Sequence, residues 1–160
     1  MRNNNDFILI AIDPGAHGAA AIGFPDGSTE VEPWTCGADF ADLIERLIVR
    51  GEADDWELRA VVEQVGGFVK GNPSPGSAMF RFGENFGFIK GVLCANKVRM
   101  ELVRPQTWQK GVIGLTGKQG VERKRALKNE AANRFPRERV TLANADALLI
   151  LDWSLKGGSR

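Results

Sequence analysis

The stretch ILIAIDPGAHGAAAI, residues 8–22, decides which fold this chain can adopt. It opens with a continuous apolar run, which is typical of a strand that is buried on both faces of a sheet. Asp13 ends the run and a Pro-Gly turn follows it, so that Ala19–Phe24 can return as a hairpin partner. An ionised carboxylate buried without a partner costs several kcal/mol. We therefore expect a partner or a metal ion beside Asp13.

The composition is that of an ordinary globular protein. Of 160 residues, 43% are hydrophobic and 26% are charged, which argues against disorder and suits one domain over residues 1–160. The start lacks the pattern of a signal peptide, and no apolar run approaches the roughly 18 residues of a membrane helix. Cys36 and Cys94 lack metal-ligand spacing and are expected to be reduced core thiols. We expect a cytoplasmic protein with no membrane partner and no small-molecule cofactor.

A net charge of +1 hides a strong asymmetry along the chain. Residues 26–63 hold eleven acidic and three basic side chains, whereas residues 97–139 hold twelve basic and four acidic ones. One strongly basic segment in a chain of neutral total charge favours a polyanionic partner. The alternative is a solvated helix face, and charge alone does not decide between the two.

Hydrophobic periodicity predicts a mixed α/β sheet layered with helices. Strands are predicted at Phe7–Ile12, Ala19–Phe24, Val31–Thr35, Leu58–Val65 and Val98–Val103. Helices are predicted at Ala38–Arg50, around Phe82–Leu93, at Pro105–Trp108, at Val121–Phe135 and after Asn144. Asn144 is expected to cap that last helix.

Gly83, Gly87 and Gly91 recur every four residues in the long predicted helix and leave one side of it smooth. A glycine inside a helix costs about 1 kcal/mol relative to alanine, so three in register indicate the close approach of another backbone. Two partners fit this pattern. One is the sheet of the same chain, and the other is a second helix, which could belong to the other subunit of a dimer.

Three acidic residues stand in apolar surroundings: Asp13, Glu63 and Asp146. If the first and fourth predicted strands are parallel neighbours, Asp13 and Glu63 lie side by side, and the last helix can present Asp146 from its first turn. Three carboxylates without Cys or His form a hard, all-oxygen site that suits Mg²⁺ or Mn²⁺. Paired metal ions serve in-line phosphoryl displacement. Each carboxylate also has a plain structural use, at a turn, in an ion pair or at a helix N-terminus.

Several motifs together resemble one family. They are IAIDPGAHGA at the first strand, VVEQV at the fourth, FRFGENFGFIKGVL in the long helix, VRPQTWQK after the fifth strand and NADALLI in the last helix. On these motifs the whole chain resembles the RuvC-type Holliday junction resolvases, in their short phage-type branch, within the ribonuclease H-like superfamily. The resemblance implies an α/β, ribonuclease H-like fold with a mixed five-stranded sheet flanked by helices.

The same resemblance implies a Mg²⁺-dependent endonuclease. A homodimer would bind branched DNA at a four-way junction and nick two opposing strands, with two Mg²⁺ ions per active site, for which Mn²⁺ could substitute. Asp13, Glu63 and Asp146 would be the metal ligands and catalytic residues, joined by Lys118 as the cation beside the scissile phosphate.

One position departs from the family. Its members usually carry a fourth acidic or histidine ligand three residues before the last aspartate, where this chain has Ala143. Asn144 and Thr141 could substitute weakly, but they are expected to be cap and strand-end residues. Asp152 lies roughly 240° around the helix from Asp146 and should point elsewhere.

The residues expected to bind DNA lie in two places. Phe68 and Lys70 follow Glu63, and there an exposed aromatic ring either stacks on an unpaired base or anchors the loop on the core. The second group would hold phosphates and comprises Lys110, Lys118, Arg123, Lys124, Arg125 and Lys128. Roughly half of this group is expected to be solvated, because neighbours on a helix point about 100° apart. Trp108 is expected to pack in the core rather than to contact DNA.

Two further functions fit these residues. A broader debranching nuclease would also cut Y-junctions and forks, and a junction-binding protein would cleave weakly or not at all because a ligand is missing at Ala143. An actin-like or sugar-kinase-like ATPase shares the DPG turn but needs a longer chain.

Overall fold

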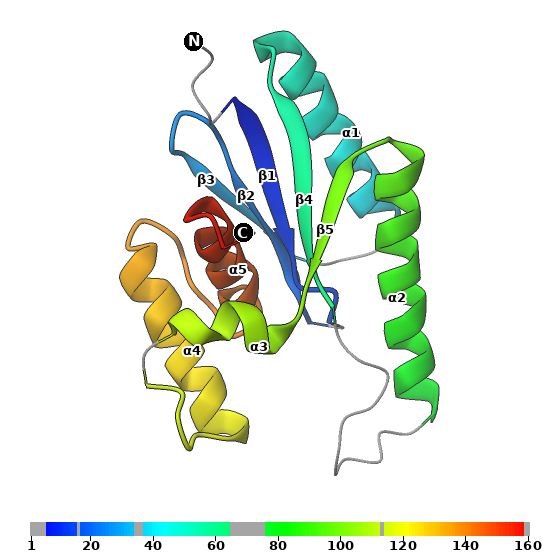
Figure 1. Cartoon of the computed structure of the whole chain (residues 1–160). Coiled ribbons are helices and arrows are strands. Elements are labelled where there is room, and N and C mark those ends of the chain that lie inside the picture. Colours follow the sequence, from blue (N-terminus) through cyan, green and yellow to red (C-terminus); the bar gives the residue numbers. More distant parts are fainter. Residues whose placement is uncertain (1–5, 16, 34–36, 65–75, 113, 159–160) are drawn as a thin grey trace.

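The computed structural model describes residues 6–15, 17–33, 37–64, 76–112 and 114–158. Within these ranges a five-stranded sheet has the order β3-β2-β1-β4-β5 (Figure 1). Its strands are β1 (Phe7–Ile12), β2 (Ala19–Gly23), β3 (Thr29–Pro33), β4 (Glu57–Glu63) and β5 (Arg99–Val103). The hairpin partners β1, β2 and β3 are antiparallel, whereas β1, β4 and β5 run parallel. The mixed five-stranded sheet predicted from the sequence is confirmed.

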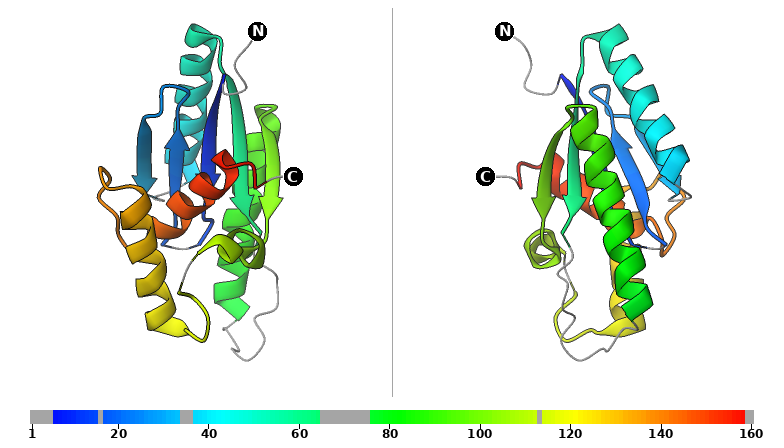
Figure 2. Two further views of the ribbon diagram at one scale, coloured as in Figure 1. Left: turned by 60° about the vertical axis from the view of Figure 1, so that its left-hand side comes forward. Right: turned by 90° about the vertical axis from the view of Figure 1, so that its right-hand side faces the viewer.

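Helices cover both faces of the sheet (Figure 2). One face carries α1 (Gly37–Asp54) and α2 (Gly76–Ala95). The other carries α3 (Pro105–Trp108), the short 3-10 turn η1 (Gln109–Gly111), α4 (Gly120–Arg134) and α5 (Ala145–Leu155). Strand β1 serves both layers because its side chains alternate: Ile8, Ile10 and Ile12 point to the α1 side, and Leu9 and Ala11 to the α5 side.

The expectation that Cys94 is a core residue is wrong, because it is a free thiol on the exposed side of α2. Asn144 is the N-cap residue of α5, as expected, but its side chain makes no capping hydrogen bond. Its Oδ1 accepts the Thr141 amide at 2.7 Å and its Nδ2 donates to the Arg139 carbonyl at 3.0 Å, so it braces the loop before the helix.

No helix in the described ranges has both the length and the apolar character that crossing a membrane requires.

The glycine stripe of α2 does not face the sheet. A Cβ built on Gly83, Gly87 or Gly91 would meet no described atom within 4 Å, and all three residues are exposed. The contact between α2 and its own chain runs instead through the buried side chains of Ile89 and Leu93. The packing of the stripe against the sheet is therefore excluded for the described residues, and the second partner considered above, another helix, stays open.

The turn after β1 is built around the Asp13 backbone. Asp13 donates its amide to the Ala19 carbonyl at 3.0 Å, and its Oδ1 accepts the Gly15 amide at 3.0 Å. Gly18 passes so close that a Cβ there would lie 2.0 Å from the Asp13 carbonyl oxygen. The glycine in this turn is thus required by a close backbone approach, and it fixes where the Asp13 carboxylate stands.

We expect Gly18→Ala to lower the free energy of unfolding by about 1–3 kcal/mol, because the added methyl group must displace the Asp13 backbone. Gly111→Ala is the matched control: a Cβ there meets no described atom within 4 Å, and its effect should stay within about 0.5 kcal/mol. Urea unfolding followed by circular dichroism measures both changes. Equal effects of the two substitutions would contradict the close approach.

Candidate active site at the ends of the parallel strands

Two carboxylates meet where β1 and β4 end. The strands pair in parallel, with Ile12 opposite Val62, so Asp13 and Glu63 follow at the same edge of the sheet. Helix α5 packs across β1 and β2 and carries Asp146 in its first turn. Figure 1 shows β1, β4 and β5 ending together, with α3 directly beyond β5. The structure therefore brings together the three carboxylates predicted from the sequence.

The three groups differ in burial and in hydrogen bonding. Glu63 is 6% exposed, and its Oε1 accepts the indole N–H of Trp108 at 2.9 Å. Asp13 and Asp146 are half-buried, and the Asp13 carboxylate is oriented by the Gly15 amide. A backbone amide and an indole thus hold two of the carboxylates before any ligand is bound.

Burial makes all three groups hard to ionise, and repulsion by a neighbouring carboxylate adds to it for Glu63 and Asp146. Burial, followed by the charge of Asp13, raises the pKa of Glu63 to about 8 and that of Asp146 to about 6. Burial also raises the pKa of Asp13, although the Gly15 amide opposes this change. The Asp13 charge thus disfavours the ionised forms of Glu63 and Asp146, and Asp146 adds to the effect on Glu63, so that a positive charge among the three would favour their ionised forms.

The site has the donor chemistry of a hard divalent cation. Three acidic side chains supply oxygen only, which is the ligand type that Mg²⁺ and Mn²⁺ prefer. In the positions they take here, no three acidic, histidine or cysteine side chains of the described residues stand close enough to hold one ion. The residues fit a divalent cation by donor type and by electrostatics.

Lys124 on α4 is the cation that acts most widely on this site. Its charge lowers the pKa of Asp13, Glu63 and Asp146, and so opposes their mutual repulsion. The Lys118 ammonium, in contrast, lies 3.8 Å from where a Cβ on Gly114 would stand, over its own loop. The family resemblance implied Lys118 as the active-site cation. In the structure, Lys124 is the lysine whose charge lowers the pKa values of all three carboxylates.

The other predicted DNA-binding residues are distributed around the site. Lys110 in η1 and Arg125 in α4 are exposed, and Lys128 is half-buried. Arg123 donates a hydrogen bond to Gln109 Oε1, so its guanidinium is engaged within the protein. Phe68 and Lys70 lie outside the described residues.

Position 143 lines a hollow beside the start of α5. Ala143 is exposed, and the hollow, of about 390 Å³, is also lined by Ala19 and Pro33. The side chains considered as substitutes for the absent ligand are engaged elsewhere. Asn144 braces its loop, and Asp152 accepts hydrogen bonds from Arg134 at 2.6 Å and from Lys156 at 2.8 Å. The expectation that Asp152 points away from the site is confirmed.

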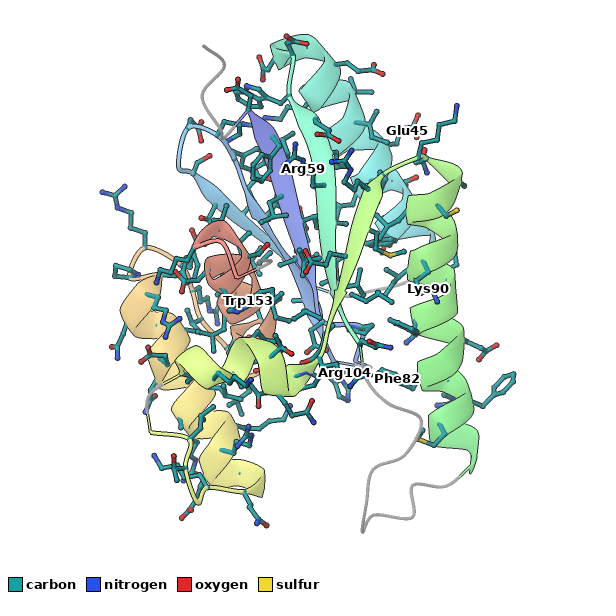
Figure 3. All side chains as sticks on the ribbon, in the orientation of Figure 1. Glu45, Arg59, Phe82, Lys90, Arg104 and Trp153 are labelled. Carbon is teal, nitrogen blue, oxygen red and sulfur yellow. The ribbon has the colours of Figure 1, made fainter. Side chains whose placement is uncertain are left out.

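Sequence reasoning missed two features of the site. The first is the hydrogen bond from Trp108 to Glu63, although the expectation that this tryptophan is a core residue is confirmed by its 1% exposure. The second is Arg104, an exposed residue that directly follows the pairing of Val103 with Glu63 and lies at the same strand-end edge (Figure 3). A basic residue directly after a predicted parallel strand is a signal that could have identified it.

Comparisons with known proteins identify the fold. No known family's sequence profile matches the chain, and no curated protein matches its sequence. A solved structure of T. thermophilus RuvC in complex with a Holliday junction substrate is similar, with a TM-score of 0.57 and 14% sequence identity over 95% of this chain and 97% of that chain. A second Thermus thermophilus RuvC structure gives a TM-score of 0.55 at the same identity, over 95% and 98% of the two chains. This chain has the ribonuclease H-like fold of those structures.

The raised pKa of Glu63 makes stability depend on pH. Because the folded state keeps this proton up to about pH 8, against an ordinary value of 4.5, folding stability is lost as the pH rises through that window. Glu63→Gln cannot ionise, and its amide oxygen can still accept from Trp108. Without divalent ions we expect the variant to melt roughly 5 °C or more above the wild type at pH 8 and close to it at pH 5. Exposed Glu101→Gln is the control, and a pH-independent difference for Glu63→Gln would refute the assignment.

Proposed function

We propose that this protein is a divalent-metal-dependent endonuclease that cuts branched DNA, with the four-way junction as its main substrate. The observation that carries the proposal is the meeting of Asp13, Glu63 and Asp146 at one edge of a ribonuclease H-like sheet. The similar RuvC structure, solved with a Holliday junction substrate, supports the choice of DNA. The motifs shared with RuvC-type resolvases support the same substrate, and a phage-type origin is part of this proposal.

Asp13, Glu63 and Asp146 would hold two Mg²⁺ or Mn²⁺ ions. When bound, such ions activate water as a nucleophile and stabilise the charge that develops on a phosphodiester. The protein's own part is to keep the carboxylates in a partly dry pocket, where burial strengthens their attraction for a cation. Lys124 would then contact the phosphate from the α4 side, together with Lys118 if the loop before α4 turns inward.

The basic surface that would bind DNA combines the start of α3, η1, the loop before α4 and α4 itself. Its exposed cations are Arg104, Lys110, Lys118, Lys124 and Arg125. Such residues bind phosphates and supply affinity without reading sequence. Phe68 and Lys70 are proposed to reach the bases at the crossover. The acidic segment of residues 26–63 lies mainly in β3, α1 and β4, which leaves the basic residues concentrated around the site.

Paired cutting requires two active sites, and we propose that α2 forms the homodimer interface. Its described side chains include Phe80, which is 67% exposed, and the stacked rings of Phe82 and Phe86. The glycine stripe of Gly83, Gly87 and Gly91 lies on the same helix, and a Cβ built on any of these glycines would meet no described atom outside the helix backbone within 4 Å. A helix that is this apolar and this exposed suits packing against its own copy, since small residues let two backbones approach closely.

The alternative that one specific observation favours is a junction-binding protein with weak cleavage. Position 143 carries an alanine where RuvC-type enzymes usually place a ligand, and the residues nearest to it are engaged in other hydrogen bonds. A broader debranching nuclease is the other candidate.

The decisive experiment labels each strand of a four-way and a three-way junction in turn and adds Mg²⁺. We expect symmetric nicks on opposing strands of the four-way junction, and a loss of at least about 100-fold in rate for Asp13→Asn with junction binding retained. Binding without cuts in Mg²⁺ or Mn²⁺ would overturn the nuclease and leave the binding protein. Equal cutting of all branched forms would favour the debranching enzyme.

The dimer has its own test. Gly87→Arg adds a long charged side chain where the monomer leaves open space, so we expect its circular dichroism to match the wild type. Light scattering at micromolar concentration should give a dimer for the wild type and a monomer for the variant. Glu52→Arg, an exposed site on α1, should remain dimeric. A monomeric wild type, with or without junction, would contradict the proposal.

A further inference from the structure

Trp108 is placed at the candidate site by short-range chain geometry. Strand β5 ends at Val103, opposite Glu63, and Pro105 begins α3 two residues later. One turn of helix then points the indole back under the strand ends, where it is 1% exposed. Its Nε1–H donates to Glu63 Oε1 at 2.9 Å, joining residues 45 apart in the sequence.

This hydrogen bond restricts how Glu63 can present its carboxylate. An indole has one donor and a rigid ring, and this ring is locked in the core layer beneath α5. Glu63 Oε1 is therefore hydrogen-bonded to a group whose position is fixed by packing. Glu63 Oε2 is the oxygen that remains for another partner. A buried indole N–H needs one acceptor, and a backbone carbonyl could serve as well as a carboxylate. Here the acceptor is Glu63, so the hydrogen bond of Trp108 also fixes the orientation of a carboxylate in the candidate site.

The segment that carries Trp108 is itself tied to the basic helix. Gln109, the next residue, accepts a hydrogen bond from Arg123, and the Gly111 carbonyl accepts one from Arg134 at 2.8 Å. Arg134 in turn pairs with Glu130 and Asp152, which joins α4 and α5. The indole is thus anchored on both sides, by β5 through Pro105 and by α4 through η1.

We propose that Trp108 is a positioning residue that holds Glu63 Oε1 and so directs Glu63 Oε2 toward a divalent cation. The proposal rests on the proposed function, because it needs the carboxylates to bind metal. A positioning role and a plain packing role differ in one respect. If Trp108 positions Glu63, then its effect on metal affinity depends on the Glu63 carboxylate being present. Partners of this kind around metal ligands typically change metal affinity 10–100-fold when they are removed.

Isothermal titration with Mn²⁺ in the absence of DNA tests the proposal without reference to cleavage. We expect Trp108→Phe to weaken Mn²⁺ binding about ten-fold or more. Trp153→Phe is the matched control, because it makes the same change in the same core layer, on the α5 side of the sheet (Figure 3), and should bind as the wild type does. Equal losses of Mn²⁺ affinity in Trp108→Phe and Trp153→Phe would overturn the proposal and show that Trp108 acts only through packing.

A double-variant cycle separates positioning from packing more sharply. Glu63→Gln alone should weaken Mn²⁺ binding, and Trp108→Phe added to it should cause no further loss, because the two residues act as one unit. Additive losses would overturn the proposal.

A second measurement keeps the test valid if Trp108→Phe does not fold. In the ¹⁵N-labelled wild type, Mg²⁺ should shift the indole N–H signal of Trp108 and leave those of the other three tryptophans in place, with signals assigned by replacing those three in turn. A bound metal ion without a shift of the Trp108 signal would refute the positioning role alone. Absence of Mn²⁺ binding by the wild type, at the level of Asp13→Asn, would overturn the proposed function and this inference with it.

Discussion

The burial of neighbouring carboxylates at the ends of two parallel strands is the constraint on which the rest of this structure depends. Parallel pairing in register sets Asp13 beside Glu63, and α5 adds Asp146 across the same edge. Burial first, and the charge of Asp13 second, raise the pKa values of Glu63 and Asp146, so these two groups keep their protons well above the ordinary range. Collecting three such groups lowers stability, and this cost supports the divalent cations proposed above.

The surroundings divide into a rigid part and a cationic part. The rigid part holds the carboxylates through uncharged donors: the Gly15 amide on Asp13 and the Trp108 indole on Glu63. The cationic part sits on separate segments, with Lys124 on α4 and Arg104 before α3, where long side chains can adjust to a phosphate. Fixed acceptors and adjustable cations would suit the DNA hydrolysis proposed above, because a metal site would have to keep its geometry while the bound substrate varies.

Local patterns predicted most of the elements and the acidic trio. Runs of Ile and Val marked β1 and β4, proline marked the start of α3, and carboxylates in apolar surroundings stood out because such burial is costly. Periodicity gave no information about partners. It could not show that the glycine stripe faces away from the sheet, or that Arg123 contacts Gln109, because these depend on which elements pack together.

The sequence by itself determined the two buried strands that end in acidic residues, the Pro-Gly turn after Asp13, and the separation of acidic from basic segments. These follow from side-chain chemistry and short-range sterics, which act over a few residues. Only the tertiary structure decided which cation acts on the carboxylates, and that Trp108 donates its indole to Glu63 across 45 residues. Contacts of that kind are set by how the layers pack against one sheet, since electrostatic and hydrogen-bonding partners are chosen by distance in space and not by distance along the chain.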